Sequence, residues 1–160
     1  MSADRVVREQ LLALLNGGNA HVTFEQAVAD FPVQHINSKA NGFEHSAWEL
    51  LEHLRICQWD IVAFIRNPSH QSPEWPAGYW PAPAMQADAA QWQRCHKQFR
   101  TDLKALKELV TASDTDFYSD LPHAPGYSIL REILIVADHN SYHLGQLVML
   151  RKLLGIWQEK

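Results

Sequence analysis

The sequence predicts an all-α fold, a four-helix bundle formed by a single domain over residues 1–160. Several long segments carry apolar residues at helical spacing, and no segment alternates apolar and polar residues with the period of two that is typical of strands. The chain has 160 residues, of which 46% are hydrophobic and 20% charged, so it can bury a core of its own. Long amphipathic helices have few ways to pack their apolar faces except as a bundle.

The N-terminal part of the chain predicts one long and one short helix. Apolar residues at helical spacing run over Asp4–Leu15, and Gly17-Gly18 ends this helix. Thr23 and Gln26 have the spacing of a capping box, which predicts a short helix that ends at Phe31-Pro32.

The second long helix begins near Ser46 and ends at Asn67-Pro68. Ser46 and Glu49 form another capping-box pattern at its start. The connection that follows, Pro68–Pro83, has 16 residues and five prolines. Such a length is unusual for a structureless loop in a compact domain, so we expect a crossover or a functional loop. An extended segment of this length could cover the whole height of a bundle.

Two further helices complete the predicted bundle. The third runs over Gln86–Ala112, and the fourth runs over Ser128–Leu154, where Gly155 supplies the stop. Each is roughly 40 Å long at about 1.5 Å per residue.

Composition and charge argue against several classes of partner. The formal net charge is −4 and no window is rich in Lys or Arg, so we expect no nucleic-acid partner. Charged or polar residues interrupt every apolar stretch, so we expect no membrane partner. Met1–Arg5 lacks the pattern of a signal peptide, and a cytoplasmic location is expected. Cys57 and Cys95 lie in helical patterns and are expected to be reduced and buried.

Two histidines lie four residues apart in the last predicted helix. His139 and His143 therefore project from the same side of that helix, one turn apart. They continue an apolar stripe that contains Val136 and Leu147, so both rings are expected to face inward or along the edge of the core. On an inward face an imidazole is costly unless it finds a partner. A metal ion would satisfy both rings. A hydrogen-bonded core pair is the alternative, because a zinc site needs at least three protein ligands.

His53, in the second long helix, is the best candidate for the third ligand. It lies about one turn from both Leu50 and Cys57, at the border of the apolar stripe. Glu49 could add a carboxylate ligand, but its role in the capping box is favoured. His96 could be a fourth ligand, although a buried partner role is favoured, and His45 is expected near the mouth of the site without binding.

The remaining histidines are expected to be solvated, because they fall in loops or at helix ends; they are His21, His35, His70 and His123. The chain contains one clear H-x3-H pair and no partner helix with an E-x-x-H motif, as dinuclear bundles have. We therefore expect a mononuclear site.

Two segments resemble the DinB-like (DNA-damage-inducible) family of the DinB/YfiT-like superfamily. They are His45–Leu54 (HSAWELLEHL) and Asp138–Gln146 (DHNSYHLGQ). The resemblance implies an up-down-down-up bundle with a long crossover between its second and third helices. It also implies one zinc or nickel ion on His53, His139 and His143, and a homodimer. Some branches of the family are thiol-dependent S-transferases or maleylpyruvate isomerases, and the family name implies no contact with DNA.

A site with three histidine ligands keeps a coordination position open, as catalytic zinc sites do. The sequence therefore favours a metal-dependent transferase or hydrolase that acts on a small molecule. The resemblance adds the expectation of a low-molecular-weight thiol as cosubstrate. Two alternatives stay open: a stress protein whose ion is only structural, and an interaction module without an ion. Candidate acceptors behind the ligands are Glu132, Asp60 and Gln146. Trp75, Tyr79 and Trp80 could line the pocket or clamp the crossover.

Overall fold

The computed structural model describes residues 3–158, and most of these residues are helical. Its α-helices are α1 (Ala3–Asn16), α2 (Phe24–Val28), α3 (Ala47–Arg66), α4 (Ala89–Thr111) and α5 (Ile129–Leu153). Two short 3₁₀ helices, η1 (Val33–His35) and η2 (Ala77–Tyr79), lie in the connections. The all-α prediction therefore holds broadly for the described part of the chain.

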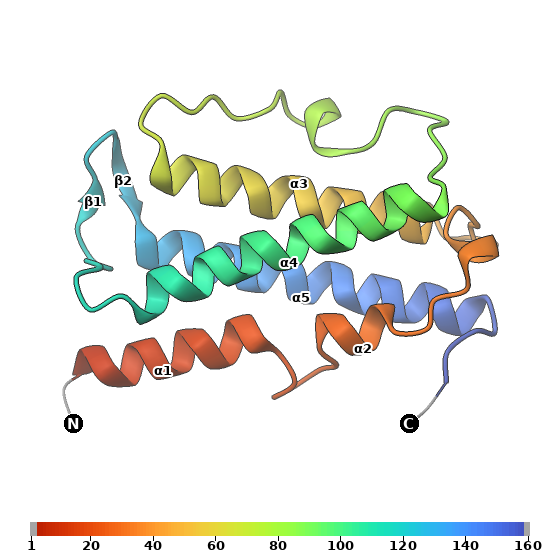
Figure 1. Ribbon diagram of the computed structural model, residues 1–160, viewed down its shortest axis with the longest axis horizontal. Helices are drawn as coiled ribbons and strands as arrows, with labels where there is room; N and C mark the ends of the chain where they lie inside the picture. Colours follow the sequence, from red (N-terminus) through yellow and green to blue (C-terminus); the bar gives the residue numbers. More distant parts are fainter. Residues whose placement is uncertain (1–2, 159–160) are drawn as a thin grey trace.

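The four long helices lie side by side. Figure 1 shows α1 and α5 running in one direction and α3 and α4 in the other. α3 packs against both α4 and α5, and α1 packs against the same two helices. The connection between α3 and α4 returns along the outside of α3, where η2 touches that helix (Figure 1). The long proline-rich segment is thus a crossover, as its length predicted.

Local sequence signals account for where the helices begin. Ser46 and Glu49 form the predicted capping box at the start of α3, and Thr23 and Gln26 form the one at α2. α4 begins three residues later than predicted, because Asp88 is its N-cap and completes a third capping box with Gln91.

A short hairpin departs from the predicted absence of strands. β1 (Asp120–Leu121) pairs antiparallel with β2 (Ala124–Ser128), immediately before α5. β1 has only two residues, and none of the β2 residues is fully buried, so neither strand can show an alternating pattern.

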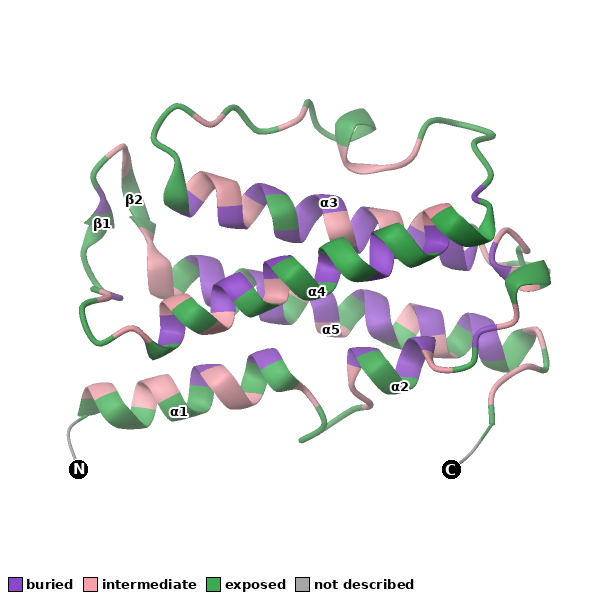
Figure 2. Cartoon of the chain, in the orientation of Figure 1, coloured by how far each residue is buried: buried purple, intermediate pink, exposed green. Residues whose placement is uncertain are grey.

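The core consists of two clusters of buried side chains at opposite ends of the helices. One contains Trp92, Phe99 and Leu147 with residues of α2 and the first half of α3, and the other joins α1 to the far ends of α3 and α4. Figure 2 shows the crossover to be largely exposed, whereas α3 is largely buried. Along α5, Val136 belongs to the second cluster and Leu144 to the first. The two histidines of α5 therefore lie where the two clusters meet.

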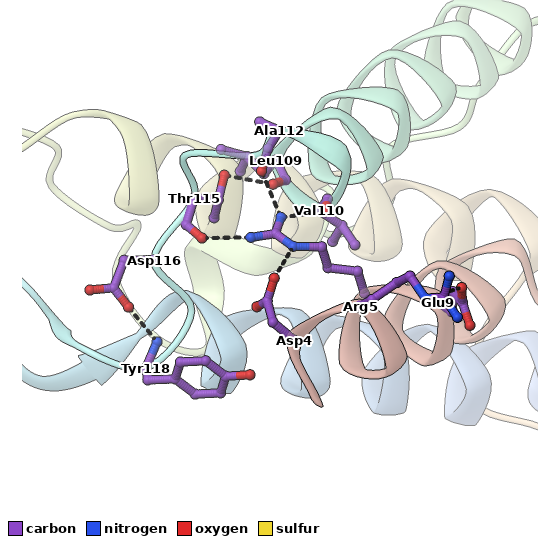
Figure 3. Close-up of polar contacts among 10 residues, drawn as sticks. Asp4, Arg5, Glu9, Leu109, Val110, Ala112, Thr115, Asp116 and Tyr118 are labelled. Atoms are coloured by element: carbon purple, nitrogen blue, oxygen red, sulfur yellow. Dashed lines mark hydrogen bonds and ion pairs between the residues drawn. The ribbon is translucent and has the colours of Figure 1, made fainter. Parts of the chain in front are cut away.

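The start of α1 is fastened to the end of α4. The Arg8 guanidinium donates to the backbone carbonyls of Val110, Ala112 and Thr115 at 2.6–2.9 Å and pairs with Asp4 (Figure 3). A cation at this position also complements the negative end of the α4 dipole.

Among residues 3–158, no helix is long and apolar enough to cross a bilayer.

Candidate metal centre

Three histidines from two helices converge on one point. His53 Nε2 of α3 lies 3.1 Å from His143 Nε2 and 3.1 Å from His139 Nε2, both of α5. One ring nitrogen from each of the three lies within 4.8 Å of the others. Ligands about 2.0–2.1 Å from a tetrahedral zinc ion are about 3.3 Å apart, so the spacing fits a single ion. The trio selected from the sequence is thus assembled by the fold.

A buried hydrogen-bond chain sets the register between the helices that carry these ligands. Asn140 Nδ2 donates to Gln58 Oε1 at 3.0 Å, and Gln58 Nε2 donates to the carbonyl of Phe99 at 2.7 Å. Asn140 directly follows His139, and Gln58 is five residues beyond His53. Because buried amides need their partners, this chain fixes how α5 lies against α3.

The outward nitrogens of two rings donate to oxygen acceptors. His53 Nδ1 donates to the carbonyl of Tyr79 at 2.8 Å, and His143 Nδ1 donates to Gln146 Oε1 at 2.7 Å. An amide oxygen can only accept, so each neutral ring carries its proton on Nδ1 and presents the Nε2 lone pair to the centre. Two lone pairs then face each other across 3.1 Å, and a shared cation would satisfy both.

Of the three acceptors predicted behind the ligands, only Gln146 contacts a ligand ring. Glu132 instead pairs with Arg131, and Asp60 accepts from His70 Nε2 and from the Tyr79 hydroxyl. The acceptor for His53 is a backbone carbonyl of the crossover, which has no signature in the sequence. Its nearest signal was the cluster of aromatic residues around Tyr79.

A model of the DinB superfamily matches residues 7–147. This range includes all three histidines and the residues of α3 that belong to the two core clusters. The chain belongs to the DinB superfamily. A comparison with curated proteins gave no match.

The histidines of this DinB superfamily chain are held in the neutral form that metal ligation needs. Burial lowers the pKa of His139 to about 3 and that of His143 to about 4, and neighbouring histidine charges lower both further. Burial also lowers the pKa of His53, whose exposed fraction is 2%. Neutral imidazoles bind a metal without first losing a proton.

Aromatic residues of the crossover cover one side of the centre. The Trp80 indole stacks on the His53 ring with centroids 3.9 Å apart and planes 1° apart, and it also stacks on His45 at 4.2 Å. His45 thus lies beside the site without joining the trio, as predicted. Trp75 is 71% exposed and touches Tyr79, so it does not cover the ligands.

The other candidate ligands have different roles. Glu49 accepts from the Ser46 backbone, as its capping position predicted, and it also pairs with Lys39. His96 is buried against Trp92 and Phe24, outside the trio. Both cysteines are buried and free, as predicted.

The prediction of a solvated ring was wrong for His70 and incomplete for His123. The His70 side chain is 9% exposed because it packs onto Asp60, and His123 Nε2 bonds to the carbonyl of Phe64. Both residues lie in connections, but these connections fold back against α3. His21 is exposed as predicted, and His35 is half-buried.

Proposed function

We propose that this DinB superfamily protein binds one divalent metal ion, zinc or nickel, on His53, His139 and His143, and acts as a metal-dependent enzyme. The observation that supports the proposal is the convergence of three imidazoles, of which His53 and His143 are buried and His139 is half-buried. Outward Nδ1–H bonds hold the Nε2 lone pairs of His53 and His143 toward the centre. The reaction class we propose is thiol-dependent group transfer or hydrolysis of a small molecule.

The chain's own residues would hold and orient the ligands. When bound, an ion with three histidine ligands supplies a Lewis acid and an open position for water or a thiol. Tyr79 and Gln146 orient His53 and His143, and Trp80 shields the His53 ring from water. Burial raises the pKa of the Cys57 thiol to about 12, so this neighbour of His53 stays protonated at neutral pH. A reactive thiol would therefore come from a low-molecular-weight cosubstrate.

A non-catalytic protein with a structural ion is the second candidate. It is favoured by the burial of His53, by the Trp80 cover and by the position of the trio between the two core clusters. In that case the ion would stabilise the packing of α3 on α5, and no position on it would accept a further ligand.

We also propose a single domain over residues 1–160, as the length of the chain predicts, and the up-down-down-up four-helix bundle that the family resemblance implies. The helix directions in Figure 1 support the second.

A homodimer is supported by exposed apolar side chains on α5, among which Ile135, Tyr142 and Met149 recur every seven residues and so share a face. A cytoplasmic location and the absence of nucleic-acid and membrane partners remain predictions.

The metal content of protein purified without a polyhistidine tag tests the proposal. We expect close to one equivalent of zinc or nickel per chain by elemental analysis. An empty protein that also fails to take up either metal on reconstitution would exclude the metal site and leave the interaction module without an ion.

Cobalt substitution distinguishes the enzyme from the structural alternative. We expect 2-mercaptoethanol to add a thiolate-to-cobalt absorption band, because a thiol can enter the open coordination position. A cobalt spectrum that excess thiol leaves unchanged would favour the structural ion.

A further inference from the structure

We propose that Asp60 is a positioning residue for the metal centre: it fastens the crossover so that the Tyr79 carbonyl and the Trp80 ring hold His53 in its ligand orientation. This inference rests on the proposed function, since it assigns a purpose to the orientation of one proposed ligand. Asp60 itself touches none of the three histidines of the trio.

Asp60 binds the crossover at two places with one carboxylate. Its Oδ1 accepts from His70 Nε2 at 2.6 Å, and its Oδ2 accepts from the Tyr79 hydroxyl at 2.7 Å. Asp60 is 8% exposed, so these bonds form with little competition from water. Bonds to an ionised acceptor are stronger than bonds between neutral groups. The carboxylate therefore ties the beginning and the middle of the crossover to a single point on α3.

Tyr79 joins that point to the metal centre. Its side chain bonds to Asp60, while its backbone carbonyl accepts from His53 Nδ1 at 2.8 Å. Asp60 and His53 are seven residues apart, so they lie two turns apart on the same side of α3. Burial, together with the bond to Asp60, raises the pKa of Tyr79 to about 12, so its hydroxyl remains a donor.

The backbone around Tyr79 leaves little freedom for its carbonyl to move. Tyr79 N donates to the Pro76 carbonyl, and Gly78 N donates to the Glu74 carbonyl at 2.7 Å. A Cβ at Gly78 would lie 2.6 Å from the Cβ of Pro73, so the turn is closely packed. A tight turn transmits the position of the tyrosine side chain to its own carbonyl.

Two contacts in different directions then hold the His53 ring. The bond to the Tyr79 carbonyl lies along a nitrogen of the ring and fixes its rotation and tautomer. The Trp80 indole lies parallel to the ring at 3.9 Å and fixes its tilt. Because Tyr79 and Trp80 are adjacent in sequence, the same attachment to Asp60 places both. Removing a hydrogen-bond partner that orients a histidine ligand typically lowers metal affinity by about 10–100-fold.

Two substitutions test the proposal, each with a matched control. Tyr79→Phe removes only the hydroxyl that reaches Asp60, and Tyr118→Phe is its control, because Tyr118 is exposed and far from the crossover in the sequence. Asp60→Asn removes the charged acceptor, and Asp102→Asn is its control, because Asp102 is a similarly buried carboxylate on α4 that bonds to Gln98. Should Asp60→Asn fail to fold, Tyr79→Phe carries the test.

The first measurement uses the protein without metal. Long-range ¹H–¹⁵N spectra of the imidazoles report which nitrogen of His53 carries the proton. We expect the Nδ1-protonated form in the wild type and in both controls, and a mixture of tautomers in Tyr79→Phe and Asp60→Asn. A loss of thermal stability in the variants with an unchanged His53 tautomer would overturn the proposal, because it would show a merely structural role.

The second measurement is metal affinity by competition with a chromophoric chelator, together with the cobalt absorption spectrum. We expect zinc and nickel affinity to fall about tenfold or more in Tyr79→Phe and Asp60→Asn relative to their controls, and the cobalt bands to shift. Affinities within twofold of the controls would overturn the proposal. If the wild type binds no metal but the tautomer of His53 still changes in the variants, the proposed function fails and the positioning role stands.

Discussion

Replacing His139 or His143 with alanine is expected to abolish retention of the metal ion. Each substitution leaves two of three protein ligands, fewer than a zinc site needs. The loss of affinity should exceed the roughly 10–100-fold cost of removing an outer hydrogen-bond partner. The metal would no longer stabilise these variants, whereas it should add about 4 kcal/mol to the wild type at a free concentration 1,000 times its Kd. Elemental analysis and thermal unfolding with and without zinc measure both effects.

His45→Ala is the matched control, because His45 lies beside the centre and stacks on Trp80 without belonging to the trio. It should retain one equivalent of metal. His53→Ala should behave like the two variants of α5, since its Nε2 is the atom nearest to both other rings. Full retention in any of the three ligand variants, in protein without a tag, would contradict the assignment.

The folded protein without metal is expected to lose stability as the pH falls. The loss begins at a pH well above the pKa values of its shielded histidines. His96, His139 and His143 have pKa values of about 4, 3 and 4, against about 6.5 in an unfolded chain. Between these pKa values the unfolded state binds more protons than the folded state. The contribution of these histidines to the free energy of unfolding is therefore complete above pH 6.5 and decreases as the pH falls. At pH 5 each such histidine costs about 2 kcal/mol. Urea unfolding at pH 7 and pH 5 measures the loss.

His96→Leu separates the two sources of this loss. His96 lies outside the trio, and its Nε2 is buried without a hydrogen-bond partner in the described part of the chain. The variant should recover about 2 kcal/mol of the difference between pH 7 and pH 5, and its metal affinity should equal that of the wild type. A pH dependence of unfolding identical to that of the wild type would show that His96 is not held neutral.

The same pKa values set the pH at which the metal is released. Because the rings of the folded protein are already neutral at pH 5, metal affinity should change little between pH 7 and pH 5 and should fall at about pH 4 and below. At an exposed histidine site the affinity would decline from about pH 6.5. Chelator competition at several pH values distinguishes the two.

The long helices and the ligand trio were predictable because each depends on local patterns. Capping boxes located the starts of α2 and α3, and the spacing of His139 and His143 on one face of α5 required only helical geometry. The partnership with His53 was inferable because a third ligand had to come from a facing helix, and His53 lies at the border of the apolar stripe of such a helix.

Other parts of the site depend on contacts that sequence patterns do not encode. The acceptor for His53 is the Tyr79 backbone carbonyl, and every residue has such a carbonyl. Asp60 seemed placed to contact His53 directly, whereas it acts on two residues of the crossover. His70 looked like a solvated loop residue, because it is buried only by the packing of the crossover against α3, which depends on tertiary structure.

The amide pair Gln58 and Asn140 makes the alignment of two helices discrete. Leucine and valine surfaces tolerate small displacements, but sliding α5 by one residue would separate Asn140 from Gln58. The buried Asn140 Nδ2 and Gln58 Oε1 would then lose the partner that each now has. The same displacement would swing His139 and His143 by about 100° around the helix axis. Incorrectly docked helices therefore lose the amide bond and the convergence of the three histidines together, so the contact that selects the correct docking of α5 on α3 also assembles the candidate metal centre.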